Sequence, residues 1–245
     1  MTCSNYNKIC TLRIKLIDRN SMTTNKIKHV SFDDLDTFET NACNFIIDTA
    51  NKSIKQKGAF KIVLCGGNTP KRIYGKLKEQ KTDWSKWNIY LGDERCLPAN
   101  HKDRNSMMIK NSLCNNVPIP SNQIFLIESE IGNIAAANKY NLMLDKEENF
   151  DLVLLGFGED GHTASLFPGH EWDDSKNAIA VFDAPKPPAN RVSMTASRLS
   201  KTNKMLYLVS GSNKGNAFQR WNDKNDLPVS KITAKGELVI YSFDI

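Results

Sequence analysis

The chain has 245 residues, of which 40% are hydrophobic and 24% are charged, the composition of an ordinary soluble globular protein. Its net charge of +6 comes from 33 basic and 27 acidic residues that are scattered along the sequence. Since no dense basic run is present, we expect no nucleic-acid partner. No stretch approaches the roughly 18 apolar residues of a membrane span, so we expect no membrane partner either.

The cysteines indicate a reducing compartment. None of them belongs to a CxxC pair, and the N-terminal residues lack the apolar core of a secretory signal. We therefore expect reduced thiols in a cytoplasmic protein. The six positions are Cys3, Cys10, Cys43, Cys65, Cys96 and Cys114.

Short apolar runs alternate with helical patterns along the chain. Strands are predicted at residues 60–65, 87–91, 124–127, 151–155, 192–195, 205–209 and 238–241. Helices are predicted from a cap at Ser31 to Gly58, from Pro70 through Leu77, over residues 106–113 and 134–144, and within 211–221. Residues 1–26 are expected to form a loosely ordered extension or an added strand, and residues 27–245 a single domain.

This alternation predicts an α/β fold, in which helices cover both faces of a mostly parallel sheet. Its crossovers are expected to be right-handed. In such a sheet, ligands bind beyond the carboxyl ends of the strands. Two predicted strands end in glycine turns, GGNTP and GFGEDGH, so the site is expected there.

The stretch 150–168, FDLVLLGFGEDGHTASLFP, carries the strongest functional signal. Its strand ends at Gly156, and Gly156, Gly158 and Gly161 let the backbone approach a ligand closely. The letters HTASLF predict the start of a helix, whose first amides could bind an anion or a developing oxyanion. The alternative is an ordinary strand-to-helix turn in which His162 only caps or packs.

Three segments resemble the 6-phosphogluconolactonase family in order and spacing. They are CGGNTPKRIY at 65–74, GDERCLP at 92–98 and GFGEDGHTASLFPGH at 156–170. The last is similar to the family signature, written roughly GxGxDGHTASLFPGH. The resemblance extends over residues 27–241, and it implies the three-layer, Rossmann-like fold of the sugar-phosphate isomerases.

By this resemblance, His162 is the general base that activates water, and Asp160 orients the imidazole or raises its basicity. The alternative for Asp160 is a turn or capping carboxylate. Hydrolysis of a δ-lactone needs neither a metal nor a covalent intermediate, and the histidines lack the spacing of a metal site. A nucleophilic Ser165 is disfavoured because no G-x-S-x-G elbow is present. No cofactor is expected, since GFGEDG lacks the context of a dinucleotide fingerprint.

The segment GGNTP is the expected cradle for part of the substrate. Gly66 and Gly67 expose backbone donors, and Asn68 and Thr69 add side-chain donors. The family usually has serine where Asn68 stands, and asparagine still donates. Arg72 either binds phosphate or is a solvated helix residue.

The block GDER adds a second set of candidates. Asp93 and Glu94 could bind sugar hydroxyls and Arg95 a phosphate, while the alternative is a structural arginine–carboxylate pair. The remaining substrate-binding candidates are Asn105, Gly158, Gly161, Arg191 and Lys214. Among these, the two basic residues are the candidates for phosphate.

The expected activity is hydrolysis of 6-phospho-D-glucono-1,5-lactone to 6-phosphogluconate, in the oxidative pentose phosphate pathway, by a monomer. A glucosamine-6-phosphate deaminase is the main alternative. That family typically reads GHIAFNEP where this chain reads GHTASLFP, with Phe167 in place of the glutamate used in ring opening. A non-catalytic sugar-phosphate sensor is a further alternative, but residues 1–26 are too short and irregular for the helix-turn-helix of such regulators.

Overall fold

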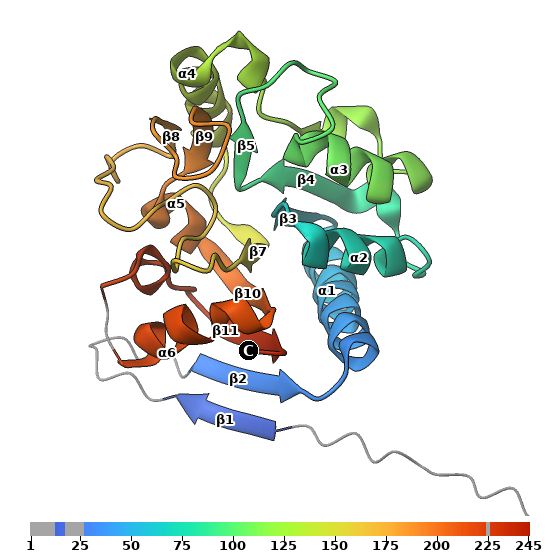
Figure 1. Cartoon of the computed structure of the whole chain (residues 1–245). Helices are drawn as coiled ribbons and strands as arrows, with labels where there is room; N and C mark the ends of the chain where they lie inside the picture. The colour runs from blue at the N-terminus through green and yellow to red at the C-terminus, as the bar shows by residue number, and fades with distance from the viewer. Residues whose placement is uncertain (1–12, 18–26, 224–225) are drawn as a thin grey trace, which may run out of the picture.

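The computed structural model describes residues 13–17, 27–223 and 226–245 (Figure 1). Predictions for residues 1–12 and 18–26, including those for Cys3 and Cys10, lie outside the described residues. The strands are β1 (Arg13–Ile17), β2 (Ile27–Phe32), β3 (Phe60–Leu64), β4 (Trp87–Leu91), β5 (Asp93–Arg95), β6 (Ile124–Phe125), β7 (Phe150–Gly156), β8 (Ala178–Val181), β9 (Arg191–Met194), β10 (Thr202–Ser210) and β11 (Glu237–Phe243).

The α-helices are α1 (Leu35–Lys57), α2 (Asn68–Leu77), α3 (Asn105–Ser112), α4 (Asn133–Leu144), α5 (Ala196–Ser200) and α6 (Gly215–Asp223). Short 3-10 helices lie between them, namely η1 (Trp84–Lys86), η2 (Cys114–Asn116), η3 (Ser121–Gln123), η4 (Ser129–Ile131), η5 (Ser212–Lys214) and η6 (Pro228–Lys231). In the described part of the chain, no helix is both long and apolar enough to cross a membrane.

An eight-stranded sheet forms the centre of the molecule, in the order β1-β2-β11-β10-β7-β3-β4-β6. All neighbouring pairs in it are parallel except β1 and β2, which pair antiparallel with Arg13 opposite Ser31. The predicted α/β fold with a mostly parallel sheet is confirmed. Of the two expectations for residues 1–26, the added strand is the correct one for residues 13–17.

Helices cover both faces of this sheet, as predicted. On one face, Phe38 of α1 packs edge-on against Phe32 of β2, with ring centroids 5.8 Å apart. On the other face, Phe218 of α6 packs against His29 of β2 at 5.0 Å. Because residues three apart on a strand point to opposite sides, α1 and α6 lie on opposite faces.

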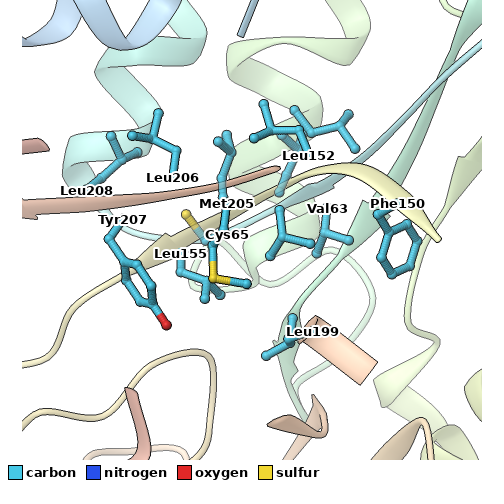
Figure 2. Packing of buried hydrophobic residues seen from close by; sticks show 14 of the residues in the cluster. Val63, Cys65, Phe150, Leu152, Leu155, Leu199, Met205, Leu206, Tyr207 and Leu208 are labelled. Carbon is cyan, nitrogen blue, oxygen red and sulfur yellow. The ribbon is translucent and has the colours of Figure 1, made fainter. Parts of the chain in front are cut away.

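The core is centred on β3, β7 and β10, whose side chains are almost all buried. In Figure 2, Leu206 and Leu208 lie on one side of β10 and Tyr207 on the other. Strands that are covered on both faces need apolar residues at successive positions, which is why their sequences read as continuous apolar runs. Each fully buried aliphatic or aromatic side chain contributes about 1.5–3 kcal/mol to folding.

Helix α1 begins at a different cap from the predicted one. Asp34 caps it by accepting the backbone N–H of Thr37 at 2.8 Å, whereas Ser31 lies in β2 opposite Ser242. The prediction was wrong because the residues before Asp34 gain more from strand pairing with β11 than from extending the helix. The predicted stop is correct, since Gly58 ends α1 with a left-handed φ of +78°.

Helix α2 begins at Asn68 with Gly67 as its N-cap, so Pro70 is its third residue and not its first. Three strands were not predicted: β2 mixes apolar and polar residues (IKHVSF), and β5 and β8 have only three and four residues. The last two flank β9 in a separate antiparallel sheet of order β5-β9-β8. This small sheet places Asp93 opposite Ser193 and Arg95 opposite Arg191.

Candidate active site

A cavity of about 350 Å³ opens at the carboxyl ends of β3 and β7, which are neighbours at the centre of the sheet. The next strand of this sheet after β3 is β4, which lies on one side of this point. The next strand of this sheet after β7 is β10, which lies on the other side. A crevice where such connections diverge is the usual ligand site of an open α/β sheet. The walls come from residues within the segments 65–70, 93–105, 156–164, 186–191 and 208–214.

His162 lies on the wall of this cavity and is oriented by Asp160. Its Nδ1 is 2.5 Å from Oδ1 of Asp160, and the same oxygen accepts the backbone N–H of His162 at 3.0 Å. The imidazole lies directly over Gly158, where an added Cβ would be 2.1 Å from Nδ1. Glycine is therefore required at position 158 for the ring to pack in this position.

The ionisation of Asp160 determines which nitrogen of His162 carries the proton. Burial by itself would raise the pKa of Asp160, but the hydrogen bonds from the side chain and backbone of His162 outweigh burial and lower that pKa to about 2. The carboxylate is thus charged at neutral pH and accepts a hydrogen bond from Nδ1–H of His162. A neutral His162 then keeps its lone pair on Nε2, as a general base requires.

The turn after β7 does not continue into a helix, so the predicted helix start at HTASLF is wrong. Gly161 (φ +85°) and Ala164 (φ +50°) have left-handed backbone conformations that interrupt right-handed helical geometry. The hydroxyl of Thr163 donates back to the carbonyl of Gly156 at 2.8 Å, which folds the segment into a compact loop. Pro168 also disfavours helical conformation in the residue before it.

The helix start that lines the cavity is instead that of α2. Gly66, Gly67, Asn68 and Thr69 all line the cavity, and the amides of a first helical turn have no partners within the helix. A Cβ on Gly66 would lie 1.9 Å from Oδ1 of Asn105, so only glycine fits there. Because Gly66 and Gly67 have no side chains, the backbone of this segment can lie close to the cavity without steric hindrance.

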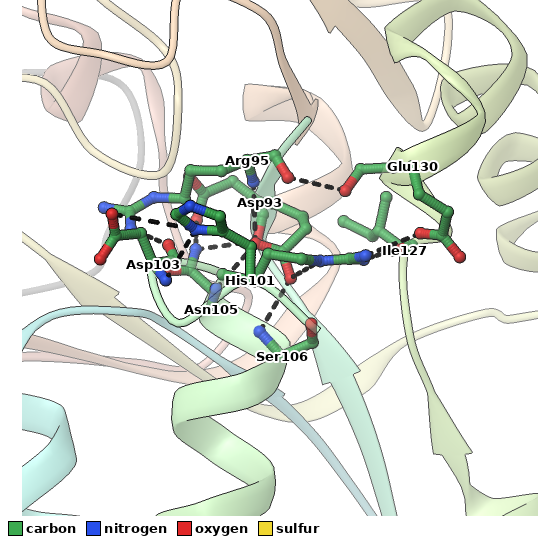
Figure 3. Close-up of polar contacts among 11 residues, drawn as sticks. Asp93, Arg95, His101, Asp103, Asn105, Ser106, Ile127 and Glu130 are labelled. Carbon is green, nitrogen blue, oxygen red and sulfur yellow. Dashed lines mark hydrogen bonds and ion pairs between the residues drawn. The ribbon is translucent and has the colours of Figure 1, made fainter. Parts of the chain in front are cut away.

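Asp93 connects separate parts of the cavity wall. Its Oδ1 accepts a hydrogen bond from Nδ2 of Asn105 at 3.0 Å, and its Oδ2 accepts one from the hydroxyl of Ser165 at 2.6 Å. Figure 3 shows the contacts around Asp93, Arg95 and Asn105. Through Ser165, this carboxylate holds the loop that carries His162 against β5.

Glu94, predicted to bind substrate, is fully buried and does not line the cavity. Its carboxylate accepts the backbone N–H groups of Arg95 (2.8 Å), Asn105 (2.7 Å) and Ser106 (2.8 Å), which caps the start of α3. It also lies 3.4 Å from the buried Arg104. For this residue the structure matches the alternative, a structural arginine–carboxylate pair.

Arg72 and Gly161 also lie outside the cavity wall. The guanidinium of Arg72 pairs with Glu39 of α1, so it joins two helices. Gly161 adopts φ +85°, and an added Cβ there would lie 2.7 Å from the side chain of Leu227. Neither residue is placed to contact a ligand in the cavity.

The other predicted basic residues, Arg95, Arg191 and Lys214, line the cavity. The buried Arg191 donates from Nη2 to the carbonyl of Lys186 at 2.7 Å, and Lys214 donates from Nζ to the carbonyl of Phe157 at 2.7 Å. Burial lowers the pKa of both Arg191 and Lys214. Because these cations are partly removed from water, an anionic ligand would stabilise their charge.

The sequence analysis did not select Lys186, Glu159 and Ser210, which line the cavity as well. Lys186 lies in the proline-rich stretch APKPPAN, and nothing local indicates that this loop folds over His162. The position of Glu159 within GFGEDGH was a usable signal. Cys65 also lines the cavity, but burial raises the pKa of its thiol to about 12, so it is not a thiolate nucleophile.

Metal ligands were not expected, and the residues available for them are few. In the ranges that the structure describes, no group of three or more histidine, cysteine, aspartate or glutamate side chains is arranged to hold a metal ion.

Comparisons with known proteins agree with this geometry. The sequence profile of the family described as glucosamine-6-phosphate isomerases/6-phosphogluconolactonase matches residues 33–240. The chain is 34% identical over 217 residues to chloroplastic 6-phosphogluconolactonase 3 of Arabidopsis thaliana, covering 80% of this chain. It is 32% identical over 202 residues to 6-phosphogluconolactonase of Mycobacterium bovis, covering 76% of this chain and 82% of that protein.

The alignment spans 66% of the length of the Arabidopsis relative, just under two thirds. Among solved structures, 6-phosphogluconolactonase of Thermotoga maritima superimposes with a TM-score of 0.81 at 27% sequence identity, covering 88% of this chain and 98% of that one. The profile match extends over most of the chain and includes every segment of the cavity wall. The chain therefore belongs to the family of glucosamine-6-phosphate isomerases and 6-phosphogluconolactonases.

Proposed function

We propose that the protein hydrolyses 6-phospho-D-glucono-1,5-lactone to 6-phosphogluconate, the second step of the oxidative pentose phosphate pathway. The observation that carries this proposal is the pairing of His162 with Asp160 on the wall of a cavity rich in cations. The names of the similar proteins from Arabidopsis, Mycobacterium and Thermotoga support the same activity.

In this mechanism His162 acts as the general base. Its Nε2 removes a proton from a water molecule, and the water oxygen attacks the carbonyl carbon of the lactone. During this step Nδ1–H remains hydrogen-bonded to Asp160. The imidazolium that forms is stabilised by the charged carboxylate. The imidazolium then returns the proton to the ring oxygen of the lactone as the bond between this oxygen and the carbonyl carbon breaks. No covalent enzyme intermediate is required.

Two groups of donors can stabilise the negative charges of the ligand. The amides of Gly67, Asn68 and Thr69 at the start of α2 offer hydrogen bonds to a phosphate or to a developing oxyanion. Arg191 and Lys214 supply positive charge to the same cavity. A phosphorylated sugar lactone matches this set better than a neutral one, because charge-assisted hydrogen bonds are about twice as strong as neutral ones.

The competing deaminase activity is less well supported by the site. Phe167, which stands where the related deaminases have glutamate, is 2% exposed, and its ring centroid lies 4.8 Å from that of His162. The guanidinium of Arg191 lies 5.4 Å from the same ring. Phe167 therefore packs beneath the site and supplies no acid or base for ring opening.

The experiment that tests the proposal is a pH-stat assay on freshly prepared 6-phosphogluconolactone. Acid release with the protein should exceed the spontaneous rate in proportion to protein concentration. The His162→Ala protein, purified in the same way, controls for contaminating activity. Acid release at the spontaneous rate with folded wild-type protein would refute the proposed function.

We also propose that residues 27–245 act as a single domain, and that the protein is a cytoplasmic monomer without nucleic-acid partners. The central sheet combines strands from β2 to β11 of this range, which supports a single domain. The buried free thiols of Cys43, Cys65 and Cys114 support a reducing compartment. Sedimentation analysis tests the monomer, and fractionation of cells tests the location, which matters because some relatives are named chloroplastic.

A further inference from the structure

One carboxylate on the cavity wall has no role in the mechanism above. The charged residues that line the cavity are Asp93, Arg95, Glu159, Lys186, Arg191 and Lys214. Asp93 is buried and occupied by Ser165 and Asn105. Glu159 differs from it, because its side chain is 42% exposed and pairs with the exposed side chain of Lys186.

Both oxygens of Glu159 are engaged. Its Oε1 is 2.6 Å from Nζ of Lys186, and its Oε2 accepts a hydrogen bond from Nδ2 of Asn213 at 2.7 Å. The charge of Lys214 also acts on this carboxylate. Glu159 therefore connects the loop that contains Lys186 with the loop after β10, and it does so on the rim of the anion-binding cavity.

The pair between Glu159 and Lys186 is suited to exchange with a ligand. The Lys186 side chain is 60% exposed, and exposed ion pairs contribute little net stability, so an incoming anion can replace the carboxylate easily. Lys186 is also tied to the cation cluster, because its carbonyl accepts a hydrogen bond from Arg191 at 2.7 Å. Lys186 can thus move from Glu159 to a ligand while its backbone remains in place.

We propose that Glu159 is a specificity-determining residue that competes with the anionic groups of the ligand for Lys186 and so weakens retention of the product. This inference rests on the proposed function. Hydrolysis leaves the phosphate intact, adds a carboxylate and releases a proton, so the product is more anionic than the lactone. The product therefore gains more than the lactone from a contact with Lys186, and a carboxylate that occupies Lys186 weakens product binding more than substrate binding.

The test is the Glu159→Gln variant, which keeps the size and hydrogen-bonding capacity of the side chain but removes its charge. Binding of 6-phosphogluconate is measured by titration calorimetry, which requires no turnover, and its inhibition constant is taken from initial rates. The dissociation constant and the inhibition constant of 6-phosphogluconate should both fall by about two- to fivefold, the range expected for one exposed charge pair. Unchanged constants would overturn the inference.

A matched control is available in Glu128→Gln. Glu128 pairs with Lys139 at 2.6 Å, with comparable exposure of both side chains, but neither residue lines the cavity. This variant makes the same change in net charge and should leave product binding unaltered. An equal effect of the two variants would show that only overall charge matters, and would overturn the specific role of Glu159.

A double-mutant cycle then isolates the competition for Lys186. In the Lys186→Gln background, the Glu159→Gln change should no longer tighten product binding. If it tightens binding as much as in the wild type, Glu159 acts by direct repulsion and the proposed competition is wrong. Failure of the proposed function is separately visible, since the wild-type protein would then release acid from the lactone only at the spontaneous rate.

Discussion

The hydroxyl of Ser165 donates to Oδ2 of Asp93 across 2.6 Å, and the two side chains are 1% and 6% exposed. The bond joins the loop that carries His162 to β5, two segments that are far apart in the sequence. A buried carboxylate that loses such a donor is left with an unsatisfied acceptor. The hydrogen bond to Asp93 therefore gives Ser165 a structural role close to His162, which accounts for its burial without making it a nucleophile.

Replacing Ser165 with alanine should lower the free energy of unfolding by about 1–3 kcal/mol, measured by urea denaturation. Activity should fall far less than in a His162 variant, because no acyl-enzyme forms. Ser175→Ala is the matched control, since Ser175 makes a similar bond to Asp173 at 2.5 Å on the exposed surface. A covalent substrate adduct on Ser165, detected by mass spectrometry, would contradict the mechanism.

His162→Ala should reduce kcat by roughly 10²–10⁴-fold, the usual contribution of a positioned general base. The variant should remain folded, because the imidazole lies at the cavity wall and not in the core. His170→Ala provides a control in the same loop, as His170 does not line this cavity. A folded His162→Ala protein with nearly normal turnover would remove His162 from the mechanism.

The pKa of Asp160 predicts a pH dependence of stability. This pKa is lowered from 3.8 to about 2 in the folded protein, so the ionised carboxylate stabilises the fold above pH 3.8. That stabilisation is lost as the pH falls from 3.8 through about 2. The difference in melting temperature between the wild type and Asp160→Asn should therefore be constant near neutrality and shrink over this acidic range. A constant difference down to pH 2 would be the contrary result.

Two glycine substitutions in one segment should have opposite effects. In Gly66→Ala, the new Cβ would lie 1.9 Å from Asn105, so the contact between Asn105 and Asp93 must break, at a cost of about 1–3 kcal/mol in unfolding free energy. In Gly75→Ala, the new methyl group meets nothing within 4 Å and lies inside α2. That variant should gain about 0.5–1 kcal/mol from helix propensity. The melting temperatures of the two variants, compared with that of the wild type, test both expectations.

Unphosphorylated gluconolactone should be hydrolysed with a kcat/KM at least about a hundredfold lower than the phosphorylated lactone, or roughly 2.7 kcal/mol of transition-state binding. Contacts to a remote phosphate help to position the carbonyl against His162. Lys214→Met should reduce activity on the phosphorylated lactone much more than on the neutral one. Equal efficiency on both lactones would show that the cavity cations do not recognise phosphate.

Much of the fold could be predicted from the sequence because its strands are covered on both faces. Apart from its second residue, each of β3, β4 and β7 is an apolar run, and this pattern indicates a buried parallel strand without knowledge of its neighbours. The end of α1 at Gly58 could also be predicted from the local sequence, since only glycine adopts the left-handed backbone conformation found there without strain. In the same way, GGNTP and GFGEDGH placed the site at two strand ends that are in fact adjacent.

Features that depend on contacts between distant segments could not be predicted. HTASLF has an acceptable helix sequence, but Ala164 is held in a left-handed conformation within a loop that Ser165 anchors to β5. The capping role of Glu94 requires the start of α3 to lie beside β5. Likewise, Lys186 reaches the cavity only because its loop leads into β9, which pairs with β5.

The arrangement of the outermost strands affects how the protein behaves in solution. An unpaired strand edge invites the edge of another molecule and promotes aggregation. Here β6 contributes only two residues to one end of the sheet, too few to template a new strand. At the other end, β1 pairs with β2 over five residue pairs. This pairing is antiparallel, whereas the rest of the sheet is parallel. Residues 13–17 thus cover the six-residue edge of β2 and make β1, which is one residue shorter, the outer margin of the sheet.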